Sequence, residues 1–194
     1  MKSSHFYHSL QRKSSFFSLC NNPVLMDDAK KSFSLDKSTG KKCYMLAARG
    51  LMIAWGGNPQ CWIWKNVPYS RFTEVAELKF VWWLEIRGKI DTSMISPITN
   101  YVVAYLVFKM RTDARGFILH PIDVSVGISR STRRSHMLRL RHPNRSDGWL
   151  EVELGEYFKQ CGNDGEVLEM SAMEVNDEKS GLIVQGIEIR PKAV

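Results

Sequence analysis

The sequence predicts an all-β fold, an antiparallel β-sandwich of jelly-roll type with one or two short helices. Three observations support this prediction. From about residue 43 onward, short runs are rich in β-branched and aromatic residues, turn residues separate these runs, and the repeated crossover helices of a βαβ fold are missing from the pattern. The 194 residues, 44% hydrophobic and 24% charged, suit one globular domain with a well-buried core.

The first part of the strand series surrounds a tight turn. CYMLAARGLMIAW (43–55) is expected to form the opening strand, and WGGNPQ (55–60) interrupts it with two Gly and an Asn-Pro pair, which favour a turn. CWIWK (61–65) is expected to resume as a strand. Since successive strand side chains point to opposite faces, Trp62 and Trp64 should share one face.

The middle of the chain predicts one helix and two central strands. SRFTEVAELK (70–79) places apolar residues at helical spacing, which predicts a short amphipathic helix with Ser70 as its cap. FVWWLEIRG (80–88) and YVVAYLVFKM (101–110) are rich in β-branched and aromatic residues and are bounded by loops. We expect both to be buried strands, with Trp83 in the core.

Four further strands are expected in the second half. IDVSVGI (122–128) and WLEVELG (149–155) alternate strictly between apolar and polar residues, as half-exposed strands do. EVLEMSAMEV (166–175) and GLIVQGIEIRP (181–191) are the last two candidates, and the polar stretch NDEKS links them. Strands therefore outnumber helices, in agreement with a sandwich.

The N-terminus differs in character from the rest of the chain. Residues 1–17 have no sustained apolar periodicity and no place in the strand series, so we expect a disordered extension followed by one domain over 18–194. An ordinary extension is favoured over an organellar transit peptide. No secretory signal is recognisable and no stretch approaches the roughly 20 apolar residues of a membrane span, so a cytoplasmic location is expected, with the nucleus as a further option.

The formal net charge of +7 is unevenly distributed. Bases exceed acids up to residue 145, and acids dominate from 146 onward. The stretch RSTRRSHMLRLRHPNR (130–145) is Arg-rich and acid-free, which favours a solvated loop, with nuclear import or phosphate binding as alternatives. Nucleic acid is therefore not the expected partner.

Motifs of catalysis and metal binding are missing. The sequence has no GxSxG, HExxH, P-loop or Rossmann glycine pattern, and its four Cys show no CxxC pair. The alternating Glu residues of the last third are typical of the solvent-exposed face of a strand rather than of the acid and base of a glycosidase. We expect no enzyme activity, no metal and no cofactor.

The two tryptophans at the edges of the glycine turn are the candidate site. Either Trp55 and Trp62 are core residues, since indole rings dominate cores, or they expose flat rings that can contact the apolar C–H face of a pyranose. Nearby carboxylates or amides would then accept hydrogen bonds from sugar hydroxyls. The residues alone leave both interpretations open.

Five collinear blocks resemble the phloem protein 2 family, which includes the tobacco-leaf type lectin. They are KKCYMLAARGLMIAWGGNPQCWIW (41–64), EVAELKFVWWLEIRGKI (74–90), YVVAYLVFKM (101–110), RSDGWLEVELGEYF (145–158) and GLIVQGIEIRPK (181–192). In addition, residues 18–51 are similar to the subgroup in which the lectin-like domain follows an F-box, a helical module that this chain is expected to lack.

The resemblance implies a β-sandwich that binds N-acetylglucosamine oligomers or N-glycan cores without catalysis. It assigns carbohydrate binding to two tryptophans and two late glutamates, which match Trp55, Trp62, Glu166 and Glu174. Glycans or glycoproteins are the expected partners, and a homodimer is a further option. The alternative is a protein-interaction module derived from a substrate adaptor that has lost its F-box.

Overall fold

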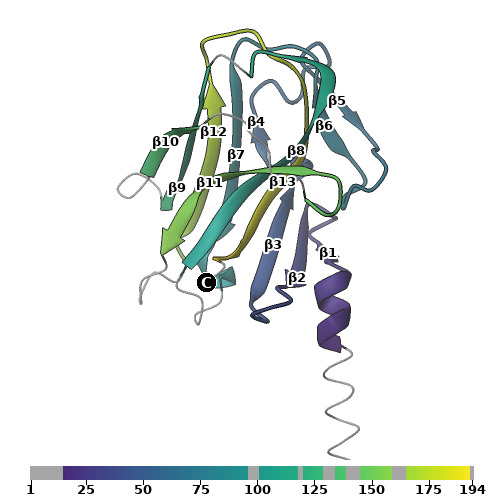
Figure 1. Cartoon of the computed structure of the whole chain (residues 1–194), viewed down its shortest axis with the longest axis vertical. Helices are drawn as coiled ribbons and strands as arrows, with labels where there is room; N and C mark the ends of the chain where they lie inside the picture. Colours follow the sequence, from purple (N-terminus) through teal and green to yellow (C-terminus); the bar gives the residue numbers. More distant parts are fainter. Residues whose placement is uncertain are drawn as a thin grey trace, which may run out of the picture.

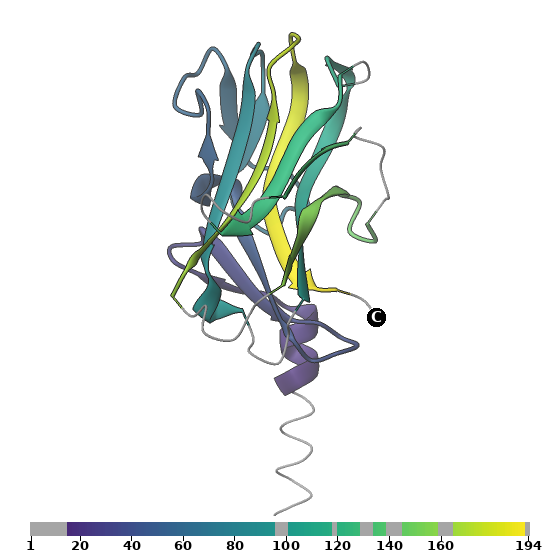
Figure 2. The ribbon, with the colours of Figure 1, turned by 90° about the vertical axis from the view of Figure 1, so that its left-hand side faces the viewer.

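Two packed antiparallel sheets make up the fold, as Figure 1 shows. The structure, a computed structural model, describes residues 15–95, 101–117, 120–128, 134–138, 145–158 and 165–192. The predicted all-β sandwich is confirmed. In the side view of Figure 2 the strands run along the long axis, and a helical segment at residues 15–21 lies beneath the lower end.

The larger sheet has eight strands in the described part of the chain. They are β1 (Val24–Met26), β2 (Lys31–Leu35), β3 (Lys42–Ala47), β5 (Trp62–Lys65), β6 (Val75–Leu78), β8 (Tyr101–Arg115), β11 (Leu150–Phe158) and β13 (Ser180–Pro191). The five strands of the second sheet are, in spatial order, β10 (Arg134–Leu138), β9 (Ile122–Ile128), β12 (Val167–Glu174), β7 (Leu84–Asp91) and β4 (Met52–Ile53). Two 3₁₀ turns, η1 (Ala48–Gly50) and η2 (Thr92–Met94), follow β3 and β7.

Strand β13 organises the larger sheet because it pairs with three neighbours. One edge pairs with β8, while the other pairs first with β6, through Ile183 and Val184, and then with β3 from Gly186 onward. A bulge between Val184 and Gly186 allows this change of partner. A Cβ at residue 186 would lie 2.0 Å from the carbonyl oxygen of Leu46, so glycine is required for the two backbones to approach.

The main core fills the space between the sheets. Alternate residues of β7, β8, β9, β12 and β13 point inward, and Ile86, Leu106 and Val184 are essentially without solvent contact. Burying side chains of this size contributes about 1.5–3 kcal/mol each, which identifies the inner faces as the main source of stability. The strands predicted at 101–110, 122–128, 149–155, 166–175 and 181–191 all supply residues to this core.

A second, smaller core lies on the outer face of the larger sheet. The segment before β6 and the turn before β11 fold over this face, and Trp149 is completely buried between them. Its indole nitrogen donates to the carbonyl of Tyr69 at 3.1 Å. Beside it, Glu188 accepts from Arg145 at 2.5 Å and from Arg71 at 3.1 Å. Although burial raises the pKa of Glu188, these guanidinium groups outweigh it and hold that pKa below its usual range.

Several local predictions were wrong. The helix expected at 70–79 is strand β6 over Val75–Leu78, because pairing with β5 and β13 buries all four of its side chains and overrides the short helical spacing. The strand expected at 43–55 is broken by η1, and the one expected at 80–88 begins only at Leu84.

The Arg-rich stretch also differs from the predicted solvated loop where the structure describes it. Arg134–Leu138 forms β10, which pairs with β9, instead of a loop. Arg145 is largely buried and carries ion pairs to Asp147, Glu151 and Glu188. Residues 129–133 and 139–144 lie outside the described ranges.

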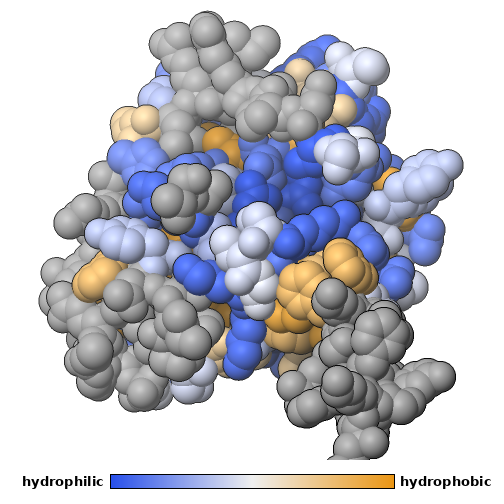
Figure 3. All heavy atoms as spheres, turned by 60° about the horizontal axis from the view of Figure 1, so that its bottom comes forward, coloured by the Kyte–Doolittle hydropathy of each residue, from blue (hydrophilic) through white to orange (hydrophobic). Residues whose placement is uncertain are grey.

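The lower end carries an apolar patch (Figure 3). All three residues of the edge strand β1 are exposed, as is Phe17. The extension predicted for residues 1–17 falls mostly on residues outside the described ranges and stays a prediction; residues 15–17 begin the helical segment. Among the described residues, no helix combines the length and apolar character that crossing a membrane requires.

Candidate functional site

Three loops meet at the upper end of the sandwich in Figure 1: 54–61 between β4 and β5, 79–83 between β6 and β7, and 175–179 between β12 and β13. The backbone N–H of Lys79 donates to the carbonyl of Cys61 at 2.8 Å. Val81 and Lys179 exchange two backbone hydrogen bonds at 3.0 and 2.8 Å. These bonds fix the three loops to one another, and we call this region the aromatic end.

Two tryptophan indoles from β5 hold the turn at 54–61 through hydrogen bonds. Trp62 donates to the carbonyl of Ala54 at 3.0 Å, and Trp64 donates to the carbonyl of Gly56 at 2.9 Å. Asn58 accepts the backbone N–H of Cys61 at 2.9 Å. The turn predicted from the glycine and Asn-Pro pattern therefore has a defined shape, and this shape fixes the position of Trp55.

Trp55 points into solvent at this end. Its backbone adopts φ of +62°, a left-handed conformation that is unfavourable for a bulky residue. The side chain is 60% exposed although it is large and apolar. This exposure agrees with the platform interpretation of Trp55 and is the feature that simple packing does not explain.

Trp62 does not expose its ring, so that expectation was wrong. Its side chain is 2% exposed and belongs to the main core. Strand alternation in β5 turns Trp62 inward, and the carbonyl of Ala54 satisfies the indole nitrogen there. Trp62 therefore supports the turn from below and presents no ring face to a ligand.

The two glutamates are at opposite ends of the molecule. Glu174 ends β12 under the aromatic end, whereas Glu166 precedes β12 and exchanges hydrogen bonds with Thr92 at the lower end. A strand of this length spans about 26 Å. The structure thus brings Trp55, Trp62 and Glu174 to one end and does not bring Glu166 to them.

Two exposed tryptophans were missed by the sequence reasoning. Trp82 is 60% exposed and Trp83 is 51% exposed, so the expectation that Trp83 lies in the core was wrong. Leu84 points inward, and alternation puts Trp83 on the outer face with Glu85. The Trp83 indole donates to Glu85 at 3.1 Å. Counting alternation backward from LEIRG could have found this placement.

A buried ion pair lies directly beneath the exposed rings. Lys179 is inaccessible to solvent, and its ammonium contacts the Glu174 carboxylate and the carbonyls of Trp82 and Asp177. Glu174 also accepts the backbone N–H of Asn176 at 2.7 Å. Burial lowers the pKa of Lys179 to about 8, which leaves it mostly protonated at neutral pH as the counter-charge of Glu174. Glu174 therefore holds the loops in place and is too buried to contact a sugar directly.

The aromatic end can supply ring faces and hydrogen-bonding groups. Trp55, Trp82 and Trp83 provide the rings, and Glu85 and Arg87, joined at 2.5 Å, provide an acceptor and a donor next to Trp83. In the residues the structure describes, His, Cys, Asp and Glu nowhere gather in a group of three able to hold a metal.

Comparison with known proteins agrees with the resemblance. The family model for phloem protein 2 matches residues 41–191. "F-box protein PP2-B10" of Arabidopsis thaliana is 46% identical, with 94% of this chain and 72% of that protein covered. "Putative F-box protein PP2-B12" of the same plant is 48% identical, with 93% of this chain and 73% of that protein covered.

Similarity to solved structures is much weaker. A family GH115 4-O-methyl-α-glucuronidase matches at 6% identity with a TM-score of 0.41, over 77% of this chain and 17% of that protein. This similarity is too low to indicate a function. The match to the family model and to the Arabidopsis relatives is extensive, and the chain therefore belongs to the phloem protein 2 family.

Proposed function

We propose that this chain is a non-catalytic glycan-binding module that recognises N-acetylglucosamine oligomers or N-glycan cores at its aromatic end. The observation that carries this proposal is the exposure of Trp55, Trp82 and Trp83, each more than half accessible, on loops that meet at one end of the sandwich. The family resemblance supplies the class of sugar. A cytoplasmic or nuclear location remains part of the proposal.

Leaving such large apolar rings in water is unfavourable. An indole buries a large apolar area when it packs, so covering three exposed indoles with a ligand would be favourable. A pyranose has an apolar C–H face that covers a ring, and its hydroxyls donate to carboxylates such as Glu85. The buried pair of Glu174 and Lys179 keeps this surface preformed, which reduces the ordering cost of binding.

A titration with N-acetylglucosamine oligomers tests the proposal. Trp55→Ala, Trp82→Ala and Trp83→Ala should each weaken binding, and loss of an aromatic anchor costs about 2 kcal/mol, roughly thirtyfold in affinity. Tyr101→Ala is the matched control because Tyr101 is an exposed aromatic residue at the lower end. Affinities that stay unchanged in all three tryptophan variants would refute the assignment.

The alternative is a protein-interaction module, and the names of the relatives favour it as the second candidate because both are F-box proteins by name. The exposed tryptophans would then contact a protein instead of a sugar. A glycan array separates the two functions. The alternative would be favoured if no glycan on the array binds the chain and if the wild type captures a protein that Trp82→Ala does not capture.

A further inference from the structure

A cavity of about 320 Å³ opens on the side of the sandwich, and it includes no residue of the three loops at the aromatic end. Its volume is within the range of small-molecule pockets. The turn between β1 and β2, the end of β3 with η1, and the segment entering β6 form its walls. The lining residues are Asp28, Ala29, Lys30, Ala47, Arg49, Phe72, Thr73 and Glu74.

One wall holds a guanidinium in a fixed position. Arg49 lies over the ring of Trp64, with 3.7 Å between its Cζ and the ring centroid, and its Nε donates to Glu74 at 2.9 Å. This hydrogen bond lowers the pKa of Glu74, so both groups are charged at neutral pH. A guanidinium has five N–H donors, and this bond uses one of them.

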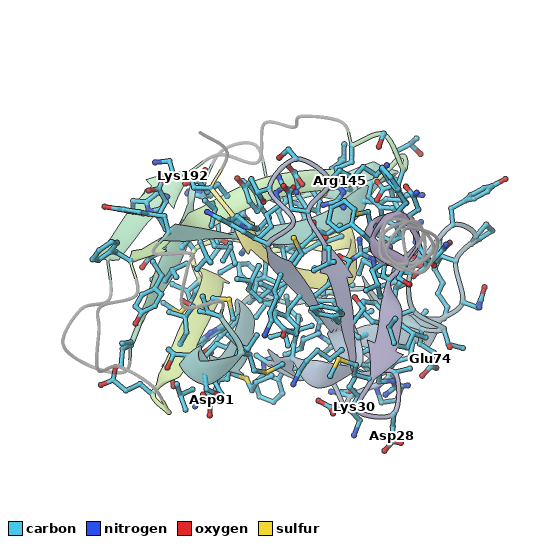
Figure 4. The ribbon with its side chains drawn as sticks, turned by 90° about the horizontal axis from the view of Figure 1, so that it is seen from below. Asp28, Lys30, Glu74, Asp91, Arg145 and Lys192 are labelled. Carbon is cyan, nitrogen blue, oxygen red and sulfur yellow. The ribbon has the colours of Figure 1, made fainter. Side chains whose placement is uncertain are left out.

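The opposite wall offers two charged groups that the protein does not use. Within the part of the chain that the structure describes, the side chains of Asp28 and Lys30 make no hydrogen bond or ion pair. Figure 4 shows both at the same edge of the molecule as Glu74. The cavity therefore carries two cations and two carboxylates, of which one of each sign lacks a partner.

The turn that carries Asp28 is strained. Asp27, Asp28 and Ala29 have φ of +51°, +53° and +61°, a left-handed conformation in three successive residues that are not glycine. Such conformations are costly for residues with a Cβ and concentrate at sites that clamp ligands. Lys31 stabilises the turn through an ion pair with Asp27 at 2.8 Å.

The charge balance selects the class of ligand. A simple anion at Arg49 and Lys30 would be repelled by Asp28 and Glu74, and a simple cation would meet the reverse problem. A dipolar molecule matches both pairs, and the buried Phe72 gives the cavity an apolar floor. We propose that this cavity binds a small zwitterion of the α-amino-acid class, with its carboxylate toward the cations and its ammonium toward the carboxylates.

The probes are L-leucine, N-acetyl-L-leucine, which lacks the ammonium, and L-leucine methyl ester, which lacks the carboxylate. Each is titrated into the full chain while backbone amide shifts are followed by NMR. L-leucine should bind with a dissociation constant on the order of 1 mM. Each blocked form should bind roughly tenfold more weakly, since it loses charge-assisted hydrogen bonds.

Two variants locate the charges. Lys30→Met should weaken binding of L-leucine roughly tenfold and leave binding of the methyl ester unchanged, because the ester has no carboxylate for Lys30 to contact. Asp28→Asn should weaken L-leucine and leave N-acetyl-L-leucine unchanged. Lys37→Met is the matched control, since Lys37 is an exposed lysine that follows the C-terminal end of β2, whereas Lys30 precedes its N-terminal end.

The proposal is wrong if L-leucine causes no shifts at residues lining the cavity, if inorganic phosphate or glucose binds there as well as L-leucine does, or if Lys37→Met weakens binding as much as Lys30→Met. Unfolding midpoints measured on the same variants show that they are folded. Because the cavity and the aromatic end share no lining residue, Trp82→Ala should leave L-leucine binding intact, so this test is independent of the glycan proposal.

Discussion

Replacing Lys179 by Met tests whether the buried ion pair holds the aromatic end. The side chains of Lys179 and Glu174 are 0% and 1% exposed, so removal of the ammonium leaves a carboxylate in the core without its counter-charge. Breaking one partner of a buried pair costs about 3–5 kcal/mol. The carbonyls of Trp82 and Asp177 also lose the ammonium as their hydrogen-bond donor, and each such bond contributes about 0.5–1.5 kcal/mol.

The double variant Lys179→Met/Glu174→Gln separates charge from packing. Without a buried charge, the site should recover part of the loss, because a neutral amide still accepts the backbone N–H of Asn176. We expect the double variant to be more stable than Lys179→Met alone by about 2 kcal/mol, because the second change removes the uncompensated buried charge.

Urea unfolding measures the free energy of each variant, and titration with N-acetylglucosamine oligomers measures the effect on the proposed site. Lys192→Met is the matched control, because Lys192 forms a comparable ion pair with Glu156 at 2.6 Å on the surface, where solvent screens it. A loss at Lys179→Met no larger than at Lys192→Met would refute the reasoning, as would a double variant no more stable than Lys179→Met alone.

Three further predictions concern stability. Trp62→Ala should cost about 3–5 kcal/mol, whereas Trp82→Ala should change the free energy of unfolding by less than about 0.5 kcal/mol; equal losses in urea unfolding would contradict the burial described for Trp62. Gly186→Ala should cost more than about 3 kcal/mol or prevent folding, because its Cβ would meet the Leu46 carbonyl, while Gly57→Ala, with open space around its Cβ, should be tolerated; circular dichroism melting compares the two. Since the pKa of Glu188 is lowered in the folded state, its contribution is present above the unfolded pKa and is lost as pH falls through the folded value, so the stability gap between wild type and Glu188→Gln should shrink below about pH 4.5 in acid titrations; a gap that is constant from pH 7 to pH 3 would argue against this linkage.

The strands that the sequence predicts well are those whose pattern and burial agree. Ile122–Ile128 alternates between inward apolar and outward polar residues, and β13 is buried along nearly its whole length because both of its faces are covered. Val75–Leu78 could not be predicted in this way. Its four buried residues depend on strands β5 and β13, which are distant in sequence, while the local spacing favours a helix.

The candidate site shows the same limit at the level of single side chains. Six tryptophans in one chain indicate either a large core or a ring platform, and composition does not decide which ring has which role. The register decides: Trp62 is inward on β5, and Trp83 is outward because Leu84 is inward on β7. A shift of one strand position thus decides whether a tryptophan packs in the core or meets solvent.

Glu174 and Lys179 have a different role from the one that their sequence positions indicate. Glu174 is the last residue of the alternating strand β12 and Lys179 lies in the loop that follows, positions at which a charged residue is usually exposed to solvent. The structure buries them together, because the bridge between Val81 and Lys179 draws the β12–β13 loop over the end of β7. Their chemistry is therefore used to hold the backbone of Trp82, and substitutions there should affect glycan binding through the geometry of the loops instead of through a lost contact with the sugar.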